Sequence, residues 1–263
     1  MILASDIYEY HLHYSSREIE EKGVNFFLEN REKIMKCMDL FADDLSCEVF
    51  SQFIQTHMLR KTLHIPHNPL AEQYFPRDIN LRKGYSRFIN CGAYNGDTVN
   101  RLNNLFGKID AIACFEPDPE NFELLTQHLC DHRENIAQNI TSFPCGVFSH
   151  ETQLHFAGGD KSNSAISDKG DFIIQCVAMD HVIPNFNPTF ISMDVEGSEL
   201  EALRGAETLM KDSRPDLAIC VYHALNHIWD IPLYLNDLCL GYKFYLRNYT
   251  SFIAETVLYA TVE

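Results

Sequence analysis

The chain has 263 residues, 46% of them hydrophobic, which is enough to bury the core of one large domain. Its 37 acidic and 21 basic residues give a formal net charge of −16, which repels a phosphate backbone and excludes nucleic acid as an expected partner. No apolar run reaches the ~20 residues of a membrane span, no basic leader opens the chain, and the nine cysteines show no C-x-x-C spacing, so we expect a cytoplasmic protein without a disulfide framework or cysteine zinc site.

The first third of the chain predicts helices followed by a loop. Apolar residues recur at steps of three and four between about 15 and 60, and prolines punctuate the stretch 61–84. We therefore divide the chain into an N-terminal helical segment with its connector, 1–84, and a second domain, 85–263. The helices form a cap, a homodimer surface or a lid over a substrate, and the sequence leaves these three roles open.

A strand and a glycine turn begin the second domain. Residues 88–98 read FINCGAYNGDT, and apolar residues at helical spacing follow as far as Leu105. In a parallel α/β sheet such a turn lies at the carboxyl ends of the strands, where nucleotides bind. Only Gly92 and Gly96 are present, and Asp97 follows them, so the dinucleotide pattern G-x-G-x-x-G is incomplete and a pyrophosphate cradle is disfavoured.

A second buried strand is predicted over 110–116 and ends in an acid. Glu116 lies twenty residues after Gly96, where a carboxylate at the tip of the second strand can accept both hydroxyls of a ribose. Together the turn and this acid favour an adenosine-type ligand.

The rest of the chain alternates strands and helices, which implies an α/β fold with a parallel sheet. Gly146 would let the third strand pass close to an adenine ring, and the hydroxyl of Ser198 can cap the helix that follows it. The expected elements are a helix at 121–132, a strand at 141–147, a hairpin of 153–156 with 172–177, a strand at 188–194, a helix from 198, a strand at 217–222, a helix at 231–240, and strands at 242–246 and 256–261.

Four motifs in this order resemble the FkbM-type S-adenosylmethionine-dependent methyltransferases. They are NCGAYNGDT at 90–98, FEPDP at 115–119, MDVEGSE at 193–199 and LRGA at 203–206, and the resemblance covers about 85–262. It implies a Rossmann-like class I methyltransferase sheet of seven strands with the last one antiparallel. It also implies S-adenosylmethionine as cofactor, held by Asn90, Gly92, Ala93, Asn95, Gly96, Thr98, Glu116, Pro117, Gly146, Val147 and Asp194.

One position departs from the family pattern. The family usually has an aspartate where this chain has Asn90. The amide keeps a hydrogen-bonding group but lacks the negative charge that would face a cationic ligand.

The chemistry of methyl transfer to a hydroxyl requires a base, and three residues at the expected sheet edge can supply one. Asp194 and Glu196 follow the fourth strand and His223 follows the fifth. His223 is suited to take a hydroxyl proton near neutral pH. Alternatively, the three side chains can hold Mg²⁺ or Mn²⁺, which lowers the pKa of the hydroxyl.

We therefore expect an S-adenosylmethionine-dependent O-methyltransferase. The resemblance points to a small-molecule or carbohydrate acceptor, with the methyl group going to a hydroxyl of a sugar, a glycan precursor or a natural product. Two alternatives are a non-catalytic protein that binds S-adenosylmethionine or another nucleoside, and a nicotinamide-dependent oxidoreductase, which the glycine spacing disfavours.

Overall fold

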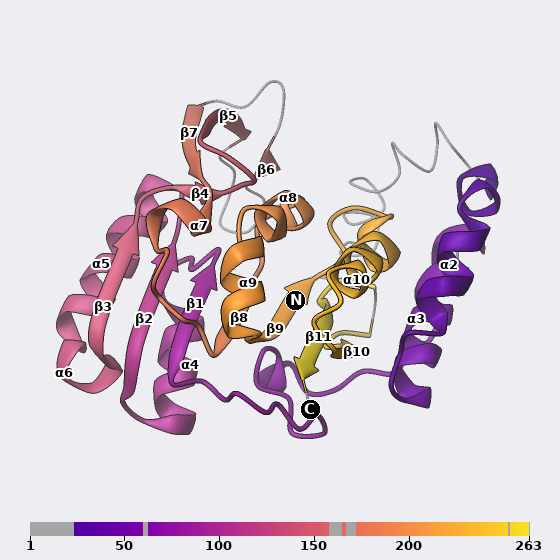
Figure 1. Cartoon of the computed structure of the whole chain (residues 1–263), viewed down its shortest axis with the longest axis horizontal. Coiled ribbons are helices and arrows are strands. Elements are labelled where there is room, and N and C mark those ends of the chain that lie inside the picture. The colour runs from indigo at the N-terminus through magenta and orange to yellow at the C-terminus, as the bar shows by residue number, and fades with distance from the viewer. Residues whose placement is uncertain (1–23, 60–62, 158–164, 167–171, 252, 263) are drawn as a thin grey trace, which may run out of the picture. The chain divides into compact units, whose positions relative to one another are not determined.

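A computed structural model describes residues 24–59, 63–157, 165–166, 172–251 and 253–262 (Figure 1). The chain divides into two compact units. The central unit is Leu81–Ile219, and the terminal unit combines Met1–Asn80 with Cys220–Glu263. Each is described in turn.

The central unit is built on parallel strands in the order β9-β8-β1-β2-β3 (Figure 1). Phe88 and Phe190 are neighbours in the register of β1 and β8, both are fully buried, and their rings lie 5.5 Å apart. Strands buried on both faces read as continuous apolar runs, which is the pattern that β1, β2 and β8 carry. The bounds are β1 (Arg87–Cys91), β2 (Ile109–Phe115), β3 (Ala137–Phe143), β8 (Phe190–Met193) and β9 (Asp216–Cys220).

Helices connect these strands. The best-defined start is that of α5, where the Asp118 carboxylate accepts hydrogen bonds from the backbone N–H groups of Glu120 and Asn121 at 2.9 and 3.0 Å, and Pro119 occupies the first turn. The helices are α4 (Asp97–Phe106), α5 (Pro119–Asp131), α6 (Arg133–Ile136), α7 (Met179–Val182), α8 (Glu199–Arg204) and α9 (Glu207–Ser213).

A small second sheet lies in the same unit, with strand order β4-β7-β5-β6. Its antiparallel pair β5 and β7 confirms the predicted hairpin. The single strand predicted at 141–147 is wrong, because the segment splits in two. β3 ends at Phe143, Pro144 has no N–H to continue the ladder, and Gly146 and Val147 pair with β7 instead. The bounds are β4 (Gly146–Val147), β5 (Thr152–Ala157), β6 (Ala165–Ile166) and β7 (Phe172–Val177).

The start of α8 also differs from the sequence prediction. The Ser198 hydroxyl donates to the carbonyl of Val195 at 3.0 Å and does not cap the helix. The buried carboxylate of Glu199 accepts the N–H groups of Val195 and Gly197 at 3.2 Å each. An acid satisfies these N–H groups better than a hydroxyl because it also favours the positive end of the helix dipole.

The terminal unit contains the predicted N-terminal helices together with the last strands. Residues 24–29 are helical, and the side chains of Phe26 and Phe27 pack on Trp229 with ring centroids 5.6 and 6.1 Å away. The predicted helix at 231–240 starts and ends earlier, as α10. The bounds are α2 (Arg31–Met38), α3 (Asp44–Leu59), the 3-10 turn η1 (Leu70–Glu72), α10 (His227–Asp237), β10 (Tyr242–Asn248) and β11 (Thr256–Val262).

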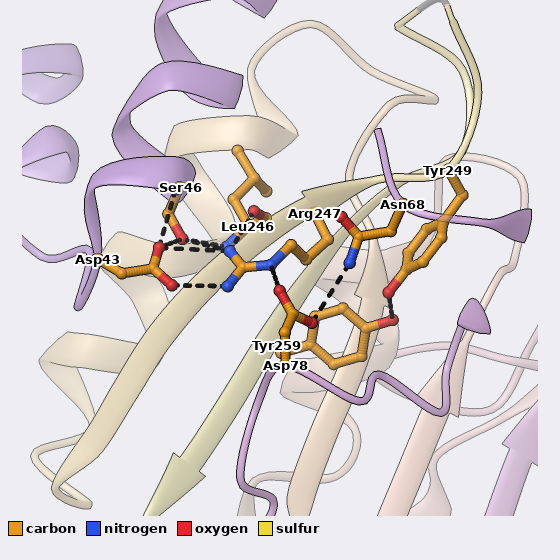
Figure 2. Close-up of polar contacts among 8 residues, drawn as sticks. All are labelled: Asp43, Ser46, Asn68, Asp78, Leu246, Arg247, Tyr249 and Tyr259. Atoms are coloured by element: carbon orange, nitrogen blue, oxygen red, sulfur yellow. Dashed lines mark hydrogen bonds and ion pairs between the residues drawn. The ribbon is translucent and has the colours of Figure 1, made fainter. Parts of the chain in front are cut away.

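A buried arginine ties the N-terminal part of this unit to β10 (Figure 2). Arg247 is 2% exposed, and its guanidinium pairs with the carboxylates of Asp43 and Asp78 at 2.6 Å each. Ser46 links the same groups, since it bonds to both Asp43 and Arg247 at 2.5 and 3.0 Å. The cation lowers the pKa of Asp43, although partial burial of that carboxyl opposes the shift.

The strand pattern confirms the predicted fold class. Among the described residues, the five parallel strands of the central unit and the antiparallel pair β10–β11 make up the seven strands expected of an α/β methyltransferase sheet, with the last one antiparallel. None of the helices within the described ranges is long and apolar enough to cross a bilayer.

Candidate functional site

The turn between β1 and α4 has an unusual backbone. Gly92, Tyr94 and Gly96 all have positive φ, at +77°, 47° and +89°. Glycine adopts these values without steric cost, whereas Tyr94 must be held there by its surroundings.

Hydrogen bonds inside the protein hold this turn. The N–H groups of Gly92 and Ala93 both donate to the carbonyl of Phe115 at 3.0 Å, and that of Gly96 donates to the carbonyl of Ala93 at 2.9 Å. The N–H of Tyr94 donates to the carboxylate of Glu116 at 2.8 Å. Since these donors are already paired, the turn is poorly suited to cradle a pyrophosphate, which needs several N–H groups pointing at it.

Internal packing explains why both positions are glycine. A Cβ at position 92 would lie 1.8 Å from the backbone oxygen of Asp194, and a Cβ at position 96 would lie 2.9 Å from the ring of His128 and 3.4 Å from Leu125. The turn is therefore pressed against the end of β8 on one side and against α5 on the other.

Glu116 holds the turn and the start of α5 at the same time. Its side chain is 6% exposed, and one carboxylate oxygen accepts from Tyr94 N while the other accepts from Asp118 N at 2.9 Å. Burial raises the pKa of Glu116 to about 7, although these backbone hydrogen bonds favour the charged form and oppose the shift. Both oxygens keep lone pairs for further donors, so a ribose diol fits this carboxylate.

Asn90 lies one residue before the end of β1 and is 2% exposed. Its Oδ1 accepts from the hydroxyl of Ser192, the neighbouring residue on β8, at 2.9 Å. Its Nδ2 is buried and has no hydrogen-bond partner among the described residues. A buried donor without an acceptor is costly, so this amide marks a point where the protein alone does not complete the hydrogen bonding.

The remaining predicted cofactor residues lie around the same strands. Thr98 is buried in the first turn of α4, Asn95 and Pro117 are half-buried, and Gly146 and Val147 form β4. At Gly146 a Cβ would lie 3.0 Å from the Cys176 sulfur on β7, which gives this glycine a packing role. All eleven residues predicted to hold the cofactor belong to the central unit.

The predicted catalytic residues come from both units. Asp194 follows β8 and its N–H donates to the carbonyl of Cys91 at 3.0 Å, and Glu196 has a positive φ of 54°. His223 follows β9 in the terminal unit, beside Tyr222, whose ring centroid is 4.2 Å away. The roles of these three residues as base or metal ligands stay predictions.

Comparison with known proteins identifies the family. The sequence model described as the methyltransferase FkbM domain matches residues 90–245. The chain belongs to this family of S-adenosylmethionine-dependent methyltransferases. The resemblance seen in the motifs is thereby confirmed, whereas no curated protein matches the sequence.

A solved FkbM methyltransferase has a similar structure. It comes from Methylobacillus flagellatus KT, with 25% sequence identity and a TM-score of 0.75. The match covers 90% of our chain but only 60% of the length of that protein.

More distant similarities are to Aeropyrum pernix fibrillarin in complex with S-adenosyl-L-methionine and to precorrin-6y C5,15-methyltransferase from Geobacter metallireducens GS-15. The first has 13% identity, covers 70% of each chain and has a TM-score of 0.41. The second has 15% identity, covers 66% of this chain and 77% of the other, and has a TM-score of 0.39.

Three buried or half-buried polar residues of this chain were not among the predicted site residues. Glu199 is fully buried at the start of α8, and Gln73 and Glu255 form a hydrogen bond in the terminal unit. Glu199 lies within the motif MDVEGSE, so its motif position was a usable signal. Gln73 and Glu255 are 182 residues apart, so no local sequence pattern links the two.

Proposed function

We propose that this FkbM protein transfers a methyl group from S-adenosylmethionine to a hydroxyl of a sugar, a glycan precursor or a natural product. The observation that carries the proposal is the buried carboxylate of Glu116 at the end of β2. It is oriented by two backbone N–H groups and can accept the hydroxyls of a ribose. The N–H groups of the neighbouring turn donate to acceptors within the protein and are not available to phosphates, so the site suits a nucleoside without phosphates.

Cofactor binding tests this proposal directly. Calorimetry with S-adenosylmethionine and S-adenosylhomocysteine should give saturable binding to the purified protein. Glu116→Ala should weaken binding by about 1–3 kcal/mol, because a buried ribose would lose a charged acceptor. Glu120→Ala, at an exposed position one turn further along the chain, is the control and should bind normally.

His223 is our candidate for the base. When bound, the cofactor supplies an electrophilic methyl group on a positively charged sulfur. As the acceptor oxygen takes up that methyl group, His223 would accept the hydroxyl proton on an imidazole nitrogen. His223→Ala should lower turnover by about 100- to 10,000-fold with cofactor affinity unchanged, whereas His181→Ala on the surface should have no effect.

A metal role for Asp194, Glu196 and His223 is the alternative reading of the same residues. Carboxylates and an imidazole can hold Mg²⁺ or Mn²⁺, which would lower the pKa of the acceptor hydroxyl. A chelator should then abolish turnover and added Mg²⁺ should restore it. If His223 acts only as a base, turnover should not change when a chelator is added.

Two other functions are separable from methyl transfer. A protein that only binds the cofactor would show normal calorimetry but no methyl release with any acceptor. A nicotinamide-dependent oxidoreductase is disfavoured because four N–H groups of the turn are paired inside the protein, and a nicotinamide fluorescence titration would test it. A cytoplasmic location, a homodimer through the N-terminal helices, and the exclusion of nucleic acid stay predictions.

A further inference from the structure

Polar contacts gather in the terminal unit where β9 ends. Tyr74 reaches Cys220, the last residue of β9, with its hydroxyl 3.5 Å from the sulfur. The N–H of Val221 donates to the carbonyl of Thr256 at 3.0 Å. His223 lies two residues beyond Val221 and Glu255 directly precedes Thr256, so Glu255 comes close to the segment that carries the candidate base.

Gln73 and Glu255 form the centre of this cluster. The Nε2 of Gln73 donates to the Oε2 of Glu255 at 2.5 Å and lies 3.3 Å from the hydroxyl of Tyr74. Gln73 is 6% exposed and Glu255 is half-buried. The pair therefore holds a half-buried glutamate whose carboxylate is oriented by an amide.

The backbone at two of these residues is strained. Tyr74 and Glu255 have φ values of 66° and 58°, a region that costs a non-glycine residue roughly 1 kcal/mol or more. The hydroxyl of Tyr259 accepts from Tyr74 N at 2.9 Å, and Tyr249 N donates to the carbonyl of Glu255 at 3.2 Å. Strain that several contacts maintain is characteristic of functional positions.

The connector that carries Gln73 is anchored on both sides of it. Asn68 N donates to the carbonyl of Asn248 at 2.8 Å, and Asp78 pairs with Arg247 (Figure 2). These two contacts attach the connector to β10 on both sides of Gln73, so the position of Gln73 is set by the tertiary structure.

We propose that Gln73 and Glu255 bind the acceptor beside His223, and that the acceptor is an uncharged, polyhydroxylated molecule of the sugar class. This inference rests on the proposed function. A carboxylate with an adjacent amide offers several acceptor lone pairs, which match neighbouring hydroxyl groups of a sugar. The same carboxylate repels acceptors that carry a phosphate or carboxylate close to the reacting hydroxyl.

The test uses the purified full chain, radiolabelled S-adenosylmethionine, and methyl glycosides of the common hexoses and 6-deoxyhexoses as acceptor probes. Wild-type protein should transfer methyl groups to at least one glycoside. Glu255→Gln and Gln73→Ala should raise the KM for that glycoside at least tenfold, with the Kd for S-adenosylmethionine unchanged. Glu255→Asp, which keeps the carboxylate, should recover part of the affinity.

Glu72→Gln is the matched control, because Glu72 neighbours Gln73 but pairs with Arg77 at 3.6 Å. It should leave the KM unchanged. The proposal is overturned if Glu255→Gln changes only kcat or Tm, or if wild-type protein binds the cofactor but methylates none of the glycosides. Loss of cofactor binding by wild-type protein would instead overturn the proposed function.

Discussion

The glycine turn of the central unit and the arginine cluster of the terminal unit are both held by several polar contacts, but the contacts differ in kind. The turn is held by backbone groups and one acid, and its partners Phe115 and Glu116 lie about twenty residues away. Arg247 is held by side chains 169 and 204 residues away. Local backbone geometry leaves a motif in the sequence, whereas a long-range ion pair leaves none.

The largest expected loss of stability follows from a substitution in the glycine turn. Gly92→Ala places a Cβ 1.8 Å from a backbone oxygen that cannot move without displacing β8, so it should reduce the free energy of unfolding by at least about 3 kcal/mol. Gly84→Ala is the control that measures the cost of the positive φ without a steric clash, because Gly84 has a φ of +66° but open space around it. It should cost about 1–2 kcal/mol in the same urea titration. Equal losses in the two variants would mean that packing against Asp194 is unimportant.

The next largest loss of stability is expected when the arginine cluster is disrupted. Arg247→Met removes the cation and leaves Asp43 and Asp78 near a buried strand, so it should cost about 3 kcal/mol. Both carboxylates remain about a third exposed, and their hydration keeps the loss from being larger. Arg204→Met on the surface, where the arginine pairs with Glu201, should change stability by less than about 0.5 kcal/mol. A similar small change for Arg247→Met would contradict the cluster's role as an anchor.

A smaller expected effect is the pH dependence of stability that Glu116 causes in the central unit. Because burial raises the pKa of Glu116 to about 7, its stabilising contribution is present below its unfolded-state value of 4.5 and is lost as pH rises through 7. Between pH 5 and 7 the ligand-free protein should lose roughly 2 kcal/mol from this group. Glu116→Gln should remove that loss in denaturant titrations at several pH values. An unchanged slope in Glu116→Gln would assign the pH dependence to other groups.

The smallest effect has the opposite sign and lies in the terminal unit. His57 is 2% exposed, and within the part of the chain that the structure describes neither of its ring nitrogens has a hydrogen-bond partner. Burial lowers the pKa of His57 to about 3. The neutral ring is therefore favoured in the folded protein, and stability is lost as pH falls below the unfolded-state value of 6.5. The loss should be roughly 1 kcal/mol between pH 6.5 and 5.5. His57→Phe should flatten this part of the profile, and a profile identical to that of wild type would exclude His57 as its cause.

Much of the fold was predictable because it follows from local patterns. Apolar runs identified β1, β2 and β8, and the helix expected at 121–132 is α5, which begins two residues earlier, at Pro119. The errors came where partners outside the segment decide the structure. β3 ends before Pro144, Gly146 and Val147 pair in another sheet, and Glu199 replaces Ser198 as the acceptor at the start of α8.

The sequence by itself determined the family, the alternation of strands and helices, and the positions of Glu116 and the glycine turn, because these depend on short motifs and on hydrophobic periodicity. Only the tertiary structure decided why Gly92 and Gly96 must be glycine, since the atoms that exclude a Cβ belong to Asp194 and His128. It alone also brought Gln73 to Glu255, and Arg247 to Asp43 and Asp78. Such pairs form only when distant segments pack together, and no local preference encodes the distance between them.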